Sequence, residues 1–135
     1  MTIDSHVHFW NYEPVKDAWI TDDMRVIQRD FLPADAQAVF TDNNVGGCVA
    51  IQADQSDAET VFLLQLAEKN PFIKGVVGWI DLLDAELEFR LGIYKNLPKL
   101  KGFRHVAQGE PDGFLIKKEI LKGIKELGKL GFTYD

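Results

Sequence analysis

Short apolar runs rich in β-branched residues alternate along this chain with longer segments of helical period. That alternation is typical of βα units built around a parallel sheet, so we expect an α/β fold. The predicted strands run from Thr2 to His8, Gly47 to Gln52, Gly75 to Ile80, Lys101 to Val106 and Phe132 to Asp135.

Four helices are expected between these strands, each with a recognisable start or stop signal. Pro33 lies in the first turn of the first helix, which ends before Gly46, and the capping-box spacing Ser56 to Glu59 begins a second helix that ends at Asn70. Asp84 is expected to cap the third helix, which Pro98 ends. The fourth helix is expected over residues 114–130, and Gly131 ends it.

The spacing of the strands limits the architecture. Their starts are separated by about 45, 28, 26 and 30 residues, close to the roughly 30 residues per unit of a (β/α)₈ barrel. Residues 1–135 therefore predict a single partial domain, the N-terminal half of a TIM barrel with about four βα units and a fifth strand. An open five-stranded parallel sheet of the flavodoxin type is the alternative, but it should have a closing helix after the fifth strand.

The net charge limits which classes of binding partner are expected. The net charge of −6 argues against nucleic acid and against an anionic membrane, because both need clustered basic residues. A small-molecule ligand is the better expectation. The lysines between Lys117 and Lys129 are spaced like the solvated face of a helix. The lone Cys48 lies in an apolar run and is expected to be a core residue in a reducing, cytoplasmic compartment.

The connection from Phe9 to Phe31 is far longer than a usual βα loop. In a barrel it would lie on the catalytic face, where long loops serve as lids or binding loops. Trp10 is its candidate ligand-contacting residue. The other reading is that its aromatic side chains only pin the loop to the rim of the barrel.

His6 and His8 are separated by one residue near the carboxyl end of the first strand. On a strand both imidazoles point to the same side, and Val7 points to the other. Barrel active sites are built at this end of the strands. Two such imidazoles can bind one divalent ion and leave positions for water and further ligands.

The segment Ile3 to Trp10 resembles the opening of the amidohydrolase-related (amidohydrolase 2) family, whose first strand carries an H-x-H pair. Further elements recur in the family's order: Phe31 to Pro33, Val49 to Ala53, Gly75 to Leu82 and Lys101 to His105. The combination is most similar to the sugar-acid lactonase branch, which includes fucono- and rhamnono-lactonase-like hydrolases.

This resemblance implies hydrolysis of a sugar-acid lactone at the mouth of the barrel. His6 and His8 would be catalytic, as ligands of a divalent metal, zinc first, or as direct contacts of the carbonyl in a metal-free site. Gln52 and Arg104 would bind substrate, and His105 is a weaker candidate, for acid–base work or as a packing residue. The structural alternatives are a buried Gln52 amide satisfied by a neighbouring loop and an Arg104 salt bridge to a loop carboxylate. Tyr134 would face the site from the last strand.

The family takes a further histidine and its catalytic aspartate from later strands. We therefore expect this chain to be incomplete for catalysis, and its open half-barrel to be covered in a homodimer or larger assembly. Two alternatives to the lactonase remain: a metal-dependent decarboxylase of the same superfamily, and a non-catalytic half-barrel that serves as an assembly module.

Overall fold

The computed structural model describes residues 1–135. Five parallel strands form one sheet in the order β1-β2-β3-β4-β5, so each strand pairs with its neighbour in sequence. The strands are β1 (Thr2–Val7), β2 (Val45–Ile51), β3 (Ile73–Gly78), β4 (Leu100–Phe103) and β5 (Thr133–Tyr134). Sequential pairing of parallel strands through crossover helices is the half-barrel arrangement that the strand spacing predicts.

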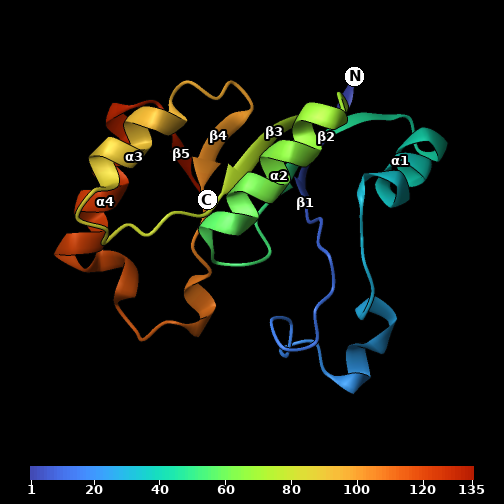
Figure 1. Cartoon of the computed structure of the whole chain (residues 1–135), viewed down its shortest axis with the longest axis horizontal. Coiled ribbons are helices and arrows are strands. Elements are labelled where there is room, and N and C mark those ends of the chain that lie inside the picture. The colour runs from blue at the N-terminus through green and yellow to red at the C-terminus, as the bar shows by residue number, and fades with distance from the viewer.

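Helices occupy the crossovers between the strands (Figure 1). They are α1 (Pro33–Asp42), α2 (Asp57–Lys69), α3 (Leu87–Tyr94) and α4 (Lys118–Lys129), with short 3₁₀ turns η1 (Asp22–Ile27), η2 (Ala107–Gly109) and η3 (Phe114–Ile116). None of these helices combines the length and the apolarity needed to cross a bilayer.

The core lies between the sheet and its helices. Fully buried Val76 on β3 and Leu63 on α2 belong to one cluster with Cys48, which has no exposed surface. Cys48 is thus the small core residue that its apolar surroundings predict. Val7 packs against the same cluster, as expected for the residue between the two histidines.

Two helix starts differ in detail from the sequence expectation. Ser56 accepts a hydrogen bond from the backbone of Glu59, but the Glu59 carboxylate turns away and accepts from the backbone of Ala53 instead. Only half of the predicted capping box is formed. Asp84 accepts from the backbone of Glu86 in the turn ahead of α3, so it closes that turn and is not itself the helix cap.

The expected helix over residues 114–130 is wrong at its start. Gly113 is left-handed, a single 3₁₀ turn follows, and Lys117 is extended before α4 begins at Lys118. Ile116 has the helical spacing of the apolar residues Ile120, Ile124 and Leu127 although it lies before this break, and its side chain is 75% exposed. Gly131 ends the helix as predicted, with φ of 82°.

The carboxyl ends of the strands open towards two long segments. Residues 9–31, which follow β1, and the connection after β4 both extend beyond this end of the sheet (Figure 1). Strand β4 is shorter than expected and ends at Phe103, so Arg104 and His105 lie in the connection and not on the strand. These two segments flank the candidate site.

Candidate active site

The imidazoles of His6 and His8 meet at the carboxyl end of β1. Their Nε2 atoms are 3.2 Å apart and the ring centroids 4.8 Å apart, nearly at right angles. β1 ends at Val7, one residue earlier than expected, so His6 lies on the strand and His8 directly after it. The two rings nevertheless meet, as the alternation of side chains along an extended chain predicts.

The tautomer of His8 follows from its other nitrogen. Nδ1 lies 3.0 Å from the carbonyl oxygen of Ile51, which can only accept, so Nδ1 carries the hydrogen and Nε2 presents its lone pair. Burial lowers the pKa of His8, opposed by this hydrogen bond, and the neighbouring His6 and Arg104 lower it further. The lowered pKa favours the neutral form of His8, which is the form that binds metals.

The histidine pair fits one metal ion. In a tetrahedral zinc site with Zn–N bonds of 2.0–2.1 Å, two nitrogen ligands are about 3.3 Å apart, and the two Nε2 atoms are separated by 3.2 Å. The Nδ1 atom of His6 faces Asp135, with 3.9 Å between Nδ1 and Oδ2. No group of three or more metal-binding side chains converges in the structure, so residues 1–135 offer this pair and no complete ligand set.

Gln52 and Arg104 are tied to each other above the end of β3. The Gln52 amide donates to the backbone oxygen of Arg104, and the Arg104 guanidinium donates to the backbone oxygen of Gln52. Gln52 has no exposed surface, and its Oε1 has no hydrogen-bond partner. A buried acceptor of this kind is costly unless something donates to it. The sequence names both residues, and the structure brings them together.

His105 is held by groups on both sides of its ring. Trp79 donates its indole N–H to Nδ1 at 3.3 Å, and Nε2 lies 2.7 Å from the Glu110 carboxylate. The ring also stacks on Phe114 with centroids 4.9 Å apart. Because both nitrogens are occupied, this geometry favours a role in positioning the loop after β4 over the acid–base role that the family resemblance implies.

Trp10 and Tyr134 each bring a polar atom without a partner. The Trp10 indole nitrogen and the Tyr134 hydroxyl are buried and unpaired. Burial raises the pKa of Tyr134, and the nearby Asp135 adds to the shift. Trp10 lines the same cavity as His8, whereas Tyr134 lies with His6 and Asp135 in an adjoining hollow.

The main cavity at this end of the sheet has a volume of about 610 Å³. Of the residues that the sequence predicts for the site, His8, Gln52, Arg104 and Trp10 line this cavity. His6, His105 and Tyr134 line the adjoining hollow instead. Side chains that the sequence reasoning missed also line the main cavity, namely Lys16, Asp17, Trp19, Asp54 and Gln55. The long connection and the β2–α2 turn have no periodicity that could reveal which of their side chains face inward.

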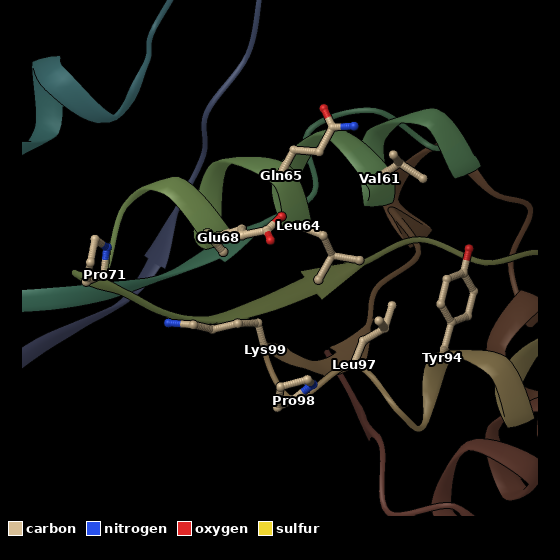
Figure 2. A pocket seen from close by; sticks show the side chains of 10 residues that line it. Val61, Leu64, Gln65, Glu68, Pro71, Tyr94, Leu97, Pro98 and Lys99 are labelled. Atoms are coloured by element: carbon tan, nitrogen blue, oxygen red, sulfur yellow. The ribbon is translucent and has the colours of Figure 1, made fainter.

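A second hollow of similar volume lies on the outer face of the molecule, between α2 and the end of α3. Figure 2 shows Leu64, Leu97 and Tyr94 turned towards one another there. Its lining contains no histidine or cysteine and is mostly apolar. This hollow is a poorer candidate for an active site, because it has neither histidine imidazoles nor an arginine guanidinium such as those at the carboxyl ends of the strands.

Comparison with known proteins finds relatives that match the whole of this chain. A curated protein named L-fucono-1,5-lactonase, from Burkholderia multivorans, is 36% identical over 137 residues, which cover all of this chain and 46% of that protein. A crystal structure of an amidohydrolase from the same species, with bound zinc, matches the whole of this chain with a TM-score of 0.94 at 36% identity. The match covers 48% of the amidohydrolase chain. These relatives support a lactonase-like protein of the amidohydrolase-related family.

The match covers only part of the relatives' length. The chain spans about half of the Burkholderia multivorans proteins that it matches. An amidohydrolase 2 structure from Bifidobacterium longum subsp. infantis, 20% identical with a TM-score of 0.67, supports the fold alone. No protein-family model matches the chain. The half-barrel expected from the strand spacing is thereby confirmed, and the relatives support the family that the sequence resembles, whereas the roles of individual site residues stay predictions.

Proposed function

We propose that residues 1–135 form one wall of the active site of a hydrolase that opens a sugar-acid lactone. The observation that carries this proposal is the convergence of His6 and His8, whose Nε2 atoms lie 3.2 Å apart at the carboxyl end of β1. In barrel enzymes the active site is built at this end of the strands. The relatives named lactonase favour this reaction over a decarboxylase and over a non-catalytic half-barrel.

The two histidines would hold a divalent metal, and the zinc bound in the related amidohydrolase structure makes zinc the first candidate. When bound, zinc supplies a Lewis acid that polarises the lactone carbonyl. His8 is prepared for this role because the Ile51 carbonyl fixes its hydrogen on Nδ1. The other ring nitrogen of His6, Nδ1, faces the carboxylate of Asp135.

The remaining residues would bind and orient the substrate. Arg104 presents guanidinium N–H donors, which suit the carbonyl and hydroxyl oxygens of a lactone. Gln52 and Trp10 line the same cavity as Arg104 and would contact the substrate beside it. In the reaction, water adds to the carbonyl carbon, the ring C–O bond breaks, and the ring oxygen takes a proton to leave a hydroxy acid.

The proposal is tested by a panel of sugar lactones. The natural protein that carries residues 1–135, loaded with zinc, is mixed with aldono-lactones, and acid release is followed with a pH indicator. We expect turnover of at least one lactone and no release of carbon dioxide from aromatic or unsaturated acids. Decarboxylation without lactone opening, or neither reaction, would contradict the proposal.

A further inference from the structure

The connection after β1 is a closed loop, and its conformation is fixed at both ends. Trp10 and Phe31 exchange two backbone hydrogen bonds of 3.0 Å, and their rings are 4.6 Å apart. The backbone of Tyr12 donates to the Asp30 carboxylate at 2.8 Å. Ile20, only 4% exposed, anchors the middle of the loop. The backbone of the loop that lines the cavity is therefore fixed at both ends.

A tight turn over residues 13–17 presents Lys16. Its backbone is fixed by three hydrogen bonds: Asp17 N–H donates to the Glu13 carbonyl, Glu13 N–H to the Asp17 carboxylate, and Lys16 N–H to the Glu13 carboxylate. Asp17 is 6% exposed, so this carboxylate is a structural part of the turn. None of the three bonds uses the Lys16 ammonium group.

That ammonium group has donors to spare. Its closest acceptor is the Asn11 carbonyl oxygen at 3.4 Å, and the Asp17 carboxylate is 3.8 Å away. An ammonium group has three N–H donors, so a single long hydrogen bond leaves most of its capacity unused. Lys16 lines the 610 Å³ cavity together with Arg104, which comes from the opposite side of the sheet end.

Trp19 lies three residues further along the same loop and also lines the cavity. It is 58% exposed although Trp is one of the largest apolar side chains. An exposed aromatic ring beside polar donors offers a face against which the carbon atoms of a sugar ring can pack. Gln52 and Trp10 line the same cavity, and each also has one buried polar atom, Oε1 and Nε1, without a hydrogen-bond partner.

We propose that this loop supplies the sugar-recognition subsite, in which the Lys16 ammonium group binds hydroxyl oxygens of a polyhydroxylated acid or its lactone and the Trp19 ring packs against its carbon face. This inference rests on the proposed function. It concerns groups of the substrate that do not react, so the contacts are equally strong before and during the reaction.

The test measures binding and turnover in the same proteins. Calorimetric titration with L-fuconate, the acid that opening of L-fucono-1,5-lactone gives, and with the uncharged sugar L-fucose measures Kd. The variants are Lys16→Met and Trp19→Leu, both at exposed side chains that contribute nothing to the core. Their matched controls are Lys125→Met on α4 and Phe89→Leu on α3, also exposed and far from the cavity lining.

We expect Lys16→Met to raise the Kd of both ligands about tenfold, which corresponds to the loss of one hydrogen bond from a charged donor. Trp19→Leu should weaken them about fivefold. KM for the lactone should rise in parallel with little change in kcat, because non-reacting contacts act equally on ground and transition states. The control variants should bind like the wild type.

Two results would overturn the subsite. One is a Kd in Lys16→Met within twofold of wild type, with only a lower melting temperature, which would make Lys16 a latch for the loop. The other is a wild-type protein that binds neither ligand. If wild type opens lactones while both variants keep its KM, the subsite is wrong and the hydrolase stands. If Lys16-dependent binding occurs without lactone turnover, the subsite stands and the hydrolase is wrong.

Discussion

At the scale of single residues, buried ionisable groups give the sharpest expectations. Cys48 has no exposed surface, and burial raises the pKa of its thiol to about 11, with the nearby Asp4 adding to the shift. The reactive form of a cysteine is the thiolate, which at pH 8 would be only about 0.1% of such a thiol. Cys48 should therefore be chemically silent in the folded protein.

This silence is measured with a thiol reagent such as Ellman's reagent at pH 8. Native protein should release less than a tenth of the signal that the urea-unfolded protein gives over the same minutes. Because the sequence contains a single cysteine, the signal has one source. Rapid stoichiometric labelling of native protein would show that Cys48 is accessible and that the core has been misplaced.

Glu59 is a buried carboxylate whose pKa is raised by desolvation, against hydrogen bonds from the backbone of Ala53 and Asp54. A folded-state pKa above the unfolded value means that the folded protein binds the proton more tightly than the unfolded chain does. Lowering the pH through the folded-state pKa towards the unfolded value therefore stabilises the fold. Relative to Glu59→Gln, the free energy of unfolding of wild type should increase as pH falls from 7 to about 4, just below the ordinary pKa of a glutamate.

Urea denaturation of both proteins at several pH values measures this difference. The comparison cancels the titration of other groups, because Gln can still accept the backbone N–H of Ala53. A difference that is flat with pH, or one that decreases as pH falls, would mean that Glu59 is not held in a desolvated site.

At the scale of elements, α2 is fastened to the end of β3 by one buried hydroxyl. Thr60 donates to the backbone oxygen of Trp79 and accepts from its backbone N–H, both at 2.8 Å. Thr60→Val keeps the shape but leaves both backbone groups unpaired, which should cost about 2 kcal/mol of unfolding free energy. Thr60→Ser keeps the hydroxyl and should cost about 1 kcal/mol for the lost methyl group.

Chemical denaturation gives both values. The informative quantity is the order of the two variants, because Thr60→Ser loses more buried carbon while Thr60→Val loses the hydrogen bonds. Should Thr60→Val prove as stable as Thr60→Ser or more so, the fastening of α2 to β3 would be unimportant.

The sequence predicted the elements whose signals are local and periodic. Strand order and the position of Pro33 at the start of α1 follow from apolar runs and backbone chemistry. The start of α4 did not follow, because Ile116 keeps the helical spacing while the backbone at Gly113 and Lys117 leaves the helix. Period alone reports which positions are apolar and cannot report the backbone conformation between them.

The site was predictable where a strand fixes the direction of side chains. The alternation of side chains along β1 and the residue that follows it sufficed to predict that His6 and His8 meet. Lys16 and Trp19 could not be found in this way, since their loop is shaped by long-range contacts such as the pairing of Trp10 with Phe31. The engagement of His105 by Glu110 likewise depends on the loop after β4, whose path no sequence pattern specifies.

At the scale of the whole molecule, the sheet has two free edges. Strand β1 pairs only with β2, and β5 only with β4, and every residue of β1 is at least partly exposed. Free edges and partly exposed sheet faces favour association with another chain. The 135-residue chain produced alone should therefore be a dimer or larger at about 100 µM by light scattering after size exclusion, whereas a monomer at that concentration would contradict this expectation.

The central claim is that His6 and His8 act together in a lactone hydrolase, and the kinetics of the natural protein test it most directly. With the best lactone of the panel and excess zinc, His8→Ala should lower kcat/KM by about 100-fold or more, because Lewis-acid stabilisation is worth several kcal/mol. The double variant His6→Ala/His8→Ala should lose little beyond that, since the two imidazoles would hold one ion. A His8→Ala protein that opens the lactone at the wild-type rate would contradict the claim.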